Sequence, residues 1–193
     1  LGLAAIGGVV AIGRTAVAGG TLANAVYRRA LADLQRSVHE ELGYNDGVRI
    51  REYALRFGLA PKIGPWPVNW CAIAFATWLE EASRELGRPM PIRGSAGAQA
   101  TMHQFMAAGL WAPQGDLRPE HLVRGNVPVW RRYIEPHPDS WQGHIGVIED
   151  FDGAGTMMTI EGNAGPAGDR VSRMTRPIND PKLFGVGLLS KLN

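Results

Sequence analysis

The chain has 193 residues, a length that fits one domain with a sizeable hydrophobic core. Its 20 basic and 18 acidic side chains give a formal net charge of +2, and the basic residues are spread along the chain, which argues against a nucleic-acid partner. The single cysteine excludes an intrachain disulfide and a zinc site built from several cysteines, and no HExxH pair is present. We therefore expect no cofactor and no metal.

The first 26 residues, LGLAAIGGVVAIGRTAVAGGTLANAV, are rich in glycine, alanine and valine. Arg14 interrupts the apolar run, so the segment lacks the span of about 20 apolar residues that crosses a membrane. A linker or a helix that packs on a partner is the favoured interpretation. A membrane-adjacent segment and a shortened targeting segment are the alternatives. We divide the chain accordingly into an N-terminal element, residues 1–44, and a second domain, residues 45–193.

Helices dominate the first half of the chain. The spacing of apolar residues predicts helices over residues 21–42, 48–57, 71–86 and 95–108, the last capped by Ser95. The run PKIGPWPVNW, residues 61–70, is predicted to be a loop because it holds three prolines and a glycine. Cys71 therefore stands where a loop meets the start of a helix.

After Gly109 the pattern changes to short apolar or alternating runs, namely VPVWRRYI, GHIGVIEDF, TMMTIEG and GVGLLSK. The connection FDGAG, between the second and third runs, is predicted to be a hairpin loop. This order predicts an α+β fold in which N-terminal helices pack on a C-terminal antiparallel β-sheet.

A thiol becomes a strong nucleophile at a helix start, and more so beside an imidazolium. Cys71 meets the first condition, and His144, which opens the strand GHIGVIED, is the best candidate for the second. Alternation places His144 and Gly146 on one face of that strand, where the small residue leaves room beside the imidazole. A hairpin around FDGAG would return Glu161 to the level of His144. There a carboxylate, or the amide of Asn163, could fix the tautomer of the imidazole.

Four blocks, WCAIAFATWL, GNVPVWRR, WQGHIGVIED and TIEGNAG, resemble the papain-like cysteine amidases and peptidases of the CHAP family, relatives of the NlpC-type cell-wall peptidases. The resemblance implies a papain-like fold, with Cys71 as the nucleophile and His144 as the general base and acid. It further implies that Glu161 orients His144 and that Asn163 supports it or polarises the substrate. Some members bind calcium through an Asp-rich loop before the cysteine, but the corresponding PKIGPWPVN has no carboxylate, so we expect no such site.

Residues in the loops beside Cys71 and His144 are candidates for contacting a substrate. They are Trp66, Asn69, Trp70, Trp141 and Gln142. The backbone N–H of Cys71 is the favoured donor to an oxyanion, with the Asn69 side chain as an alternative.

The residues imply acyl transfer, and the resemblance implies a peptidoglycan hydrolase. Two bonds fit equally well: the lactyl-to-L-Ala amide, and a peptide bond of the stem or cross-bridge.

We expect action at the bacterial cell wall, extracytoplasmic or virion-associated. The N-terminal segment suggests a larger assembly or a longer chain. One candidate is a phage tail or virion-associated lysin in which residues 1–44 contact assembly proteins, and a free endolysin or a secreted autolysin is another. A non-catalytic structural or binding module on the same fold is the contrasting hypothesis, and an acyl transferase with an amine acceptor would use the same residues.

Overall fold

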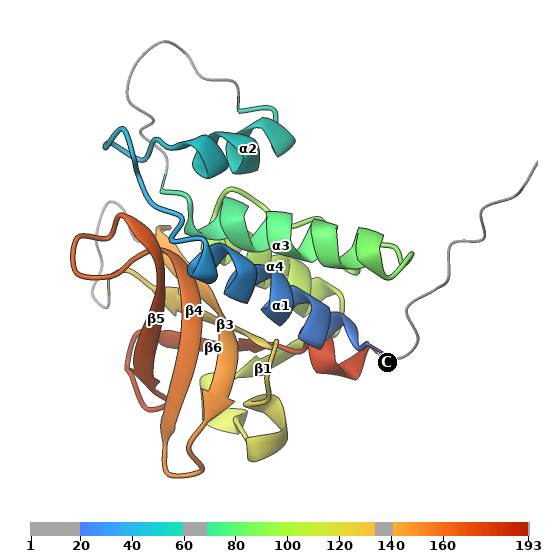
Figure 1. Cartoon of the computed structure of the whole chain (residues 1–193). Coiled ribbons are helices and arrows are strands. Elements are labelled where there is room, and N and C mark those ends of the chain that lie inside the picture. The colour runs from blue at the N-terminus through green and yellow to red at the C-terminus, as the bar shows by residue number, and fades with distance from the viewer. Residues whose placement is uncertain (1–19, 60–68, 134–140, 193) are drawn as a thin grey trace, which may run out of the picture.

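The computed structural model describes residues 20–59, 69–133 and 141–192. Within these ranges the fold is mixed α+β, with four α-helices and one six-stranded antiparallel sheet (Figure 1). The helices are α1 (Leu22–Gln35), α2 (Val48–Arg56), α3 (Cys71–Glu85) and α4 (Ala98–Ala107). The strands are β1 (Trp111–Pro113), β2 (Val127–Arg131), β3 (Gly143–Phe151), β4 (Thr156–Ala164), β5 (Arg170–Pro177) and β6 (Leu183–Gly187), in the sheet order β1-β6-β2-β3-β4-β5. The predicted order of helices followed by antiparallel strands is confirmed.

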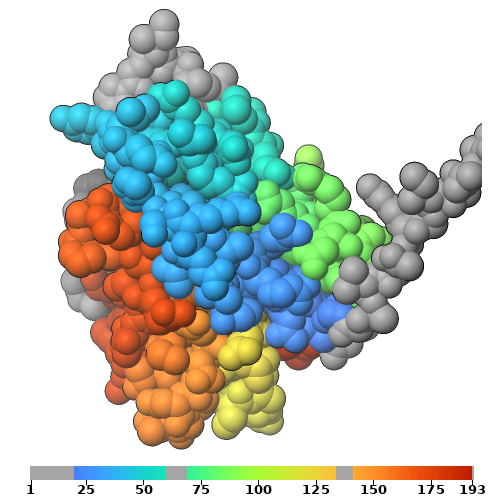
Figure 2. All heavy atoms as spheres, in the orientation of Figure 1, coloured from blue at the N-terminus to red at the C-terminus, as the bar shows by residue number. Residues whose placement is uncertain are grey.

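Helix α1 belongs to the main core of the molecule. Its buried residues Leu22 and Val26 share one apolar cluster with Trp78 and Leu79 of α3. The segment from about residue 20 to about residue 45 crosses the front of the molecule between the other helices and the sheet (Figures 1 and 2). The boundary expected at residue 44 therefore does not separate two cores, and residues 1–19 lie outside the described residues.

The prediction that the first helix continues to residue 42 is wrong. Helix α1 ends at Gln35, and Ser37 then adopts a left-handed conformation with a φ of 54°. Beyond this point the Val38 carbonyl accepts a hydrogen bond from the Val171 amide at 2.9 Å, so the chain runs beside β5. Val38 has helical spacing but is buried against the sheet, and Leu42 is exposed.

Helix α3 holds Cys71 at its first turn. The helix predicted from apolar spacing is confirmed, and Phe75, Trp78 and Leu79 are fully buried. Every residue from Cys71 to Leu79 is buried, so this half of the helix is enclosed on all sides rather than along one face. Trp70, the N-cap residue, is also fully buried and lies against β4. A Cβ atom added to Gly162 would lie 2.7 Å from the Trp70 ring, so this close approach requires glycine. The position of Cys71 is thus set by packing on both sides of the helix start.

The hairpin predicted around FDGAG is confirmed. Strands β3 and β4 pair antiparallel and place Gly146 opposite Glu161. The predicted alternation along β3 is confirmed as well. Ile145 and Val147 join the core beneath the helices, whereas Ile148 joins a second apolar cluster. The register therefore returns Glu161 to the level of His144.

Several other element bounds differ from the prediction. Helix α4 begins at Ala98 with Gly97 as its N-cap, and the Ser95 hydroxyl instead accepts a hydrogen bond from the Gly97 amide at 3.2 Å. Strands β1 and β5 were not predicted, because β1 is very short and β5 is a largely polar edge strand. Strand β6 begins at Leu183, and the end of the predicted GVGLLSK run forms a short 3-10 helix instead.

Candidate active site

Cys71 and His144 approach each other from α3 and β3. Both residues line one hollow of about 290 Å³, here called the thiol hollow, and the Cys71 sulfur lies within hydrogen-bonding reach of the imidazole. Cys71 is 4% exposed and the His144 side chain is 23% exposed. A reactant therefore reaches the sulfur through this hollow, alongside the imidazole.

Glu161 fixes the orientation of His144. The imidazole Nε2 lies 2.7 Å from Glu161 Oε2. The carboxylate is fully buried and accepts two further hydrogen bonds from the Arg176 guanidinium, at 2.8 and 2.6 Å, and one from the Thr159 hydroxyl at 2.6 Å. Because Nε2 is engaged by Glu161, Nδ1 is the ring nitrogen that remains for the thiol of Cys71.

The charges of the site shift the pKa values of both partners. Burial disfavours the imidazolium, but the Cys71 sulfur and the Glu161 carboxylate outweigh burial and raise the pKa of His144 to about 10. Burial also disfavours the carboxylate, yet hydrogen bonds from Arg176 and His144 lower the pKa of Glu161 to about 2. These opposite shifts favour a charged His144–Glu161 pair at neutral pH.

Asn163 borders the thiol hollow, and its hydrogen bonds go to the backbone rather than to His144. Its Oδ1 accepts a hydrogen bond from the Trp70 amide at 3.0 Å, and its Nδ2 donates to the Gly168 carbonyl. Its φ of 56° is left-handed, a conformation that asparagine tolerates better than most residues. Asn163 therefore ties the end of β4 to the residue before Cys71.

The three candidates for substrate contact that precede Cys71 differ in their surroundings. Asn69 is exposed and lines the thiol hollow beside Cys71. Trp70 was a candidate for contacting a substrate, but its ring is fully buried and its Nε1 donates to Glu40 Oε1 at 3.0 Å. Trp70 thus supports the helix start from within and offers no face to a substrate. Trp66 lies outside the described residues.

The two candidates for substrate contact that precede His144, Trp141 and Gln142, lie just before β3. Trp141 is 67% exposed and free to meet a large substrate. The Gln142 carbonyl accepts hydrogen bonds from the Gln99 side chain at 2.9 Å and from the Arg132 amide at 3.1 Å. These bonds hold the segment that leads into His144.

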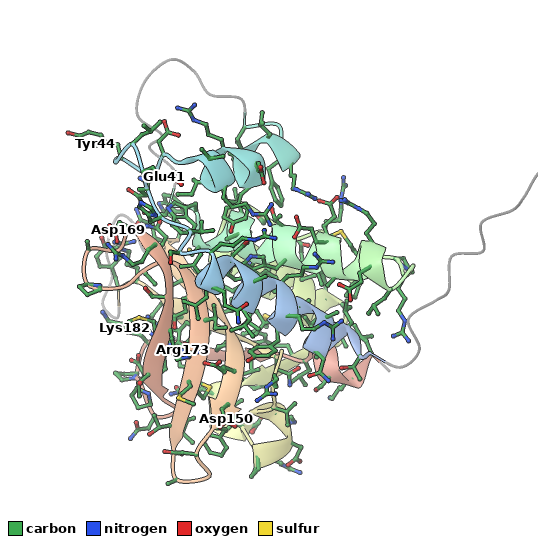
Figure 3. The ribbon with its side chains drawn as sticks, viewed as in Figure 1. Glu41, Tyr44, Asp150, Asp169, Arg173 and Lys182 are labelled. Atoms are coloured by element: carbon green, nitrogen blue, oxygen red, sulfur yellow. The ribbon has the colours of Figure 1, made fainter. Side chains whose placement is uncertain are left out.

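Some residues of the site were not anticipated from the sequence. Glu40, Tyr44 and Asn45 of the loop after α1 line the thiol hollow, and the exposed Tyr44 lies at the outer edge of the molecule (Figure 3). Glu40 was assigned to a helix and Tyr44 to the N-terminal element, and Asn45 was placed at the start of the second domain. Trp130 lies opposite His144 in the sheet, with ring centroids 6.1 Å apart. Arg176 belongs to the unpredicted β5; the alternation in RVSRMTRP is the signal that could have placed it on the face of Glu161.

Comparison of the chain with protein families, with curated proteins and with solved structures found no match. Among the described residues, no group of three or more His, Cys, Asp or Glu side chains is placed to hold a metal ion. No helix in residues 20–59, 69–133 or 141–192 is long and apolar enough to cross a membrane.

Proposed function

We propose that this chain is a cysteine-dependent hydrolase with a papain-like fold that cuts an amide bond of peptidoglycan. The observation that carries the proposal is the continuous set of contacts from Cys71 through His144 to the buried carboxylate of Glu161. A helix that starts at the cysteine, packed on antiparallel strands that carry the histidine and the carboxylate, supports the papain-like assignment. The substrate class rests on the CHAP-like motifs.

The first step is attack of the Cys71 sulfur on the amide carbonyl carbon. The imidazolium of His144 favours the thiolate form of a neighbouring cysteine. The developing oxyanion lies at the start of α3, where the first N–H groups of a helix have no intrahelical acceptor. The Trp70 amide is already bonded to Asn163, so the Cys71 amide is the nearest available donor, with the Asn69 side chain beside it.

The second step releases the amine and leaves a thioester on Cys71. His144 donates its proton to the leaving nitrogen as the C–N bond breaks. Neutral His144 then accepts a proton from water, the resulting hydroxide attacks the thioester, and the acid product leaves. Glu161 stays ionised throughout and stabilises the imidazolium, while Arg176 and Thr159 hold the carboxylate in place.

The proposal assigns the activity to the bacterial cell wall, in an extracytoplasmic or virion-associated protein. The lactyl-to-L-Ala amide and the peptide bonds of the stem or cross-bridge both suit this chemistry. Because α1 contributes to the main core, residues 22–44 are part of the hydrolase unit in this proposal. Contacts of residues 1–19 with a phage tail or another assembly remain a separate hypothesis.

Digestion of purified sacculi followed by mass spectrometry of the released muropeptides tests the function. We expect the wild type to release products with new amino termini and no new reducing sugars. The Cys71→Ala and His144→Gln variants should release none, while the control His103→Gln, at an exposed position of α4, should match the wild type. Release of the same products by Cys71→Ala would overturn the assignment of the nucleophile. A folded wild type that releases nothing would favour the non-catalytic module, and products joined to an added amine would indicate acyl transfer.

A further inference from the structure

A second hollow adjoins the thiol hollow at His144. Its volume is about 270 Å³, and it shares Arg132, His144, Asn163 and Gly168 with the thiol hollow. Cys71 lines the thiol hollow only. His144 therefore stands where the two hollows meet.

The walls of this second hollow carry an excess of positive charge. Among the described residues its basic side chains are Arg132, Arg176 and Lys182, against the single carboxylate of Asp180. The Arg131 guanidinium instead stacks on the Phe184 ring, which does not line this hollow. The charge of Arg176 is already neutralised by Glu161, whose Oε2 lies 2.6 Å from Arg176 Nη2. Arg132 and Lys182 are exposed, and neither makes an ion pair within the part of the chain that the structure describes. In the view of Figure 3, Lys182 lies beyond β5, on the side opposite α1.

One residue of these walls holds a donor that lacks an acceptor. Trp130 Nε1 is buried and has no hydrogen-bond partner among the described residues. Buried N–H groups in folded proteins are nearly always paired, so this unpaired donor is unusual. A hollow with spare positive charge and a spare donor suits an anionic group.

The proposed chemistry orients the substrate across the two hollows. The acyl half of the amide becomes bonded to Cys71 and so lies in the thiol hollow. The leaving nitrogen accepts its proton from Nδ1 of His144 and so lies beside the imidazole, where the two hollows meet. The half of the substrate that carries the amine is thus directed at Arg132 and Lys182.

We propose that the second hollow binds a carboxylate on the amine side of the bond that is cut. This inference rests on the proposed function and narrows its substrate to amides whose leaving half is acidic. The stem peptides of peptidoglycan carry free carboxylates, beginning with that of D-glutamate. The hollow would therefore favour an acidic stem over one in which these carboxylates are amidated.

Binding to the Cys71→Ala protein tests the inference without turnover. The probes are L-alanyl-D-glutamic acid and its diamide, titrated by calorimetry. We expect the acid to bind about 10-fold more tightly than the diamide, because charge-assisted hydrogen bonds are the stronger ones. Adding Arg132→Gln or Lys182→Gln should weaken binding of the acid about 5-fold and leave the diamide unchanged. Lys191→Gln, an exposed lysine outside the hollow, is the control.

Asp180→Asn provides a change in the opposite direction. Asp180 Oδ1 accepts a hydrogen bond from the Lys182 amide at 2.9 Å, which an asparagine oxygen can replace. Removing the single carboxylate that the described residues contribute to the hollow should tighten binding of the acid about 2- to 3-fold. Equal binding of acid and diamide, or no effect of either basic variant, would overturn the inference.

The two proposals fail separately. If wild-type protein leaves sacculi intact but the acid preference holds, the proposed function is wrong and the hollow remains an anion site. If sacculi are cut but acid and diamide bind alike, the inference about the hollow is wrong and the proposed function stands.

Discussion

The Nε2 atom of His144 lies 2.7 Å from Oε2 of Glu161, and this contact determines which ring nitrogen faces the cysteine. The carboxylate cannot turn away, because Arg176 and Thr159 hold both of its oxygens in a fully buried position. The imidazole therefore presents Nδ1 to Cys71 without any rearrangement. Preorganisation of this kind is what a general acid and base requires.

Glu161→Gln should damage both activity and stability. The amide keeps the shape of the side chain but leaves Arg176 without its carboxylate and His144 without its charged partner. We expect kcat to fall about 10- to 100-fold and the free energy of unfolding to fall by about 2–4 kcal/mol. Steady-state kinetics and urea unfolding measure the two effects. Asp150→Asn, an exposed change on the neighbouring strand (Figure 3), is the control, and equal behaviour of the two variants would contradict the role of Glu161.

The charge on His144 should make stability depend on pH. Its pKa is raised from 6.5 to about 10, so the stabilisation it supplies is fully present below pH 6.5 and is lost as the pH rises through about 10. We therefore expect the difference in melting temperature between wild type and His144→Gln to shrink as the pH rises from about 6 to about 10. Thermal unfolding across this range measures it. A difference that stays constant would show that the imidazole is not held in its charged form.

Gly146→Ala should disturb the orientation of His144 without direct contact with the side chain of Cys71 or His144. A Cβ atom at this position would lie 2.7 Å from Cγ of Glu161, so the carboxylate must move. We expect kcat to fall about 10-fold with little change in KM, and stability to fall by about 1–3 kcal/mol. Gly115→Ala is the matched control, because a Cβ there meets nothing within 4 Å. Unchanged kcat in Gly146→Ala would mean that Glu161 can move away from the added methyl group without disturbing His144.

The stability of the protein should depend more on the Oδ1 acceptor of Asn163 than on its Nδ2 donor. Asn163→Asp keeps an oxygen for the Trp70 amide, whereas Asn163→Ala removes it and also disfavours the left-handed φ of 56°. We expect Asn163→Ala to lose about 1–2 kcal/mol of stability and Asn163→Asp to lose less. Urea unfolding compares them. The reverse ranking would assign the main role to the bond with Gly168.

Local patterns allowed much of the site to be predicted. The apolar spacing of α3 and the alternation along β3 are properties of short segments and can be recognised in the sequence, even though the fold buries both faces of β3 and all sides of the start of α3. The turn residues of FDGAG then set the hairpin, and the hairpin alone brings Glu161 to the level of His144. Cys71 and its partners could therefore be proposed before any tertiary contact was known.

Features that depend on contacts between distant segments could not be predicted in this way. Val38 has the spacing of a helix residue, but its burial comes from pairing beside β5, more than a hundred residues later. Trp70 was expected to be accessible because it follows a loop, yet it is buried against Gly162 of β4. Arg176 lies on a polar edge strand, where alternation could indicate its face of the sheet, but only the pairing of β5 with β4 brings it to Glu161.

Alkylation of the thiol tests the pairing of Cys71 with His144 most directly. Cys71 is the only cysteine, so the rate of reaction with iodoacetamide, followed by intact-protein mass spectrometry, reports this position alone. The imidazole lies within hydrogen-bonding reach of the sulfur, so at about pH 6 we predict that the wild type reacts at least about 10-fold faster than His144→Gln. His103→Gln should react like the wild type. Equal rates for wild type and His144→Gln would contradict the activation of Cys71 by His144.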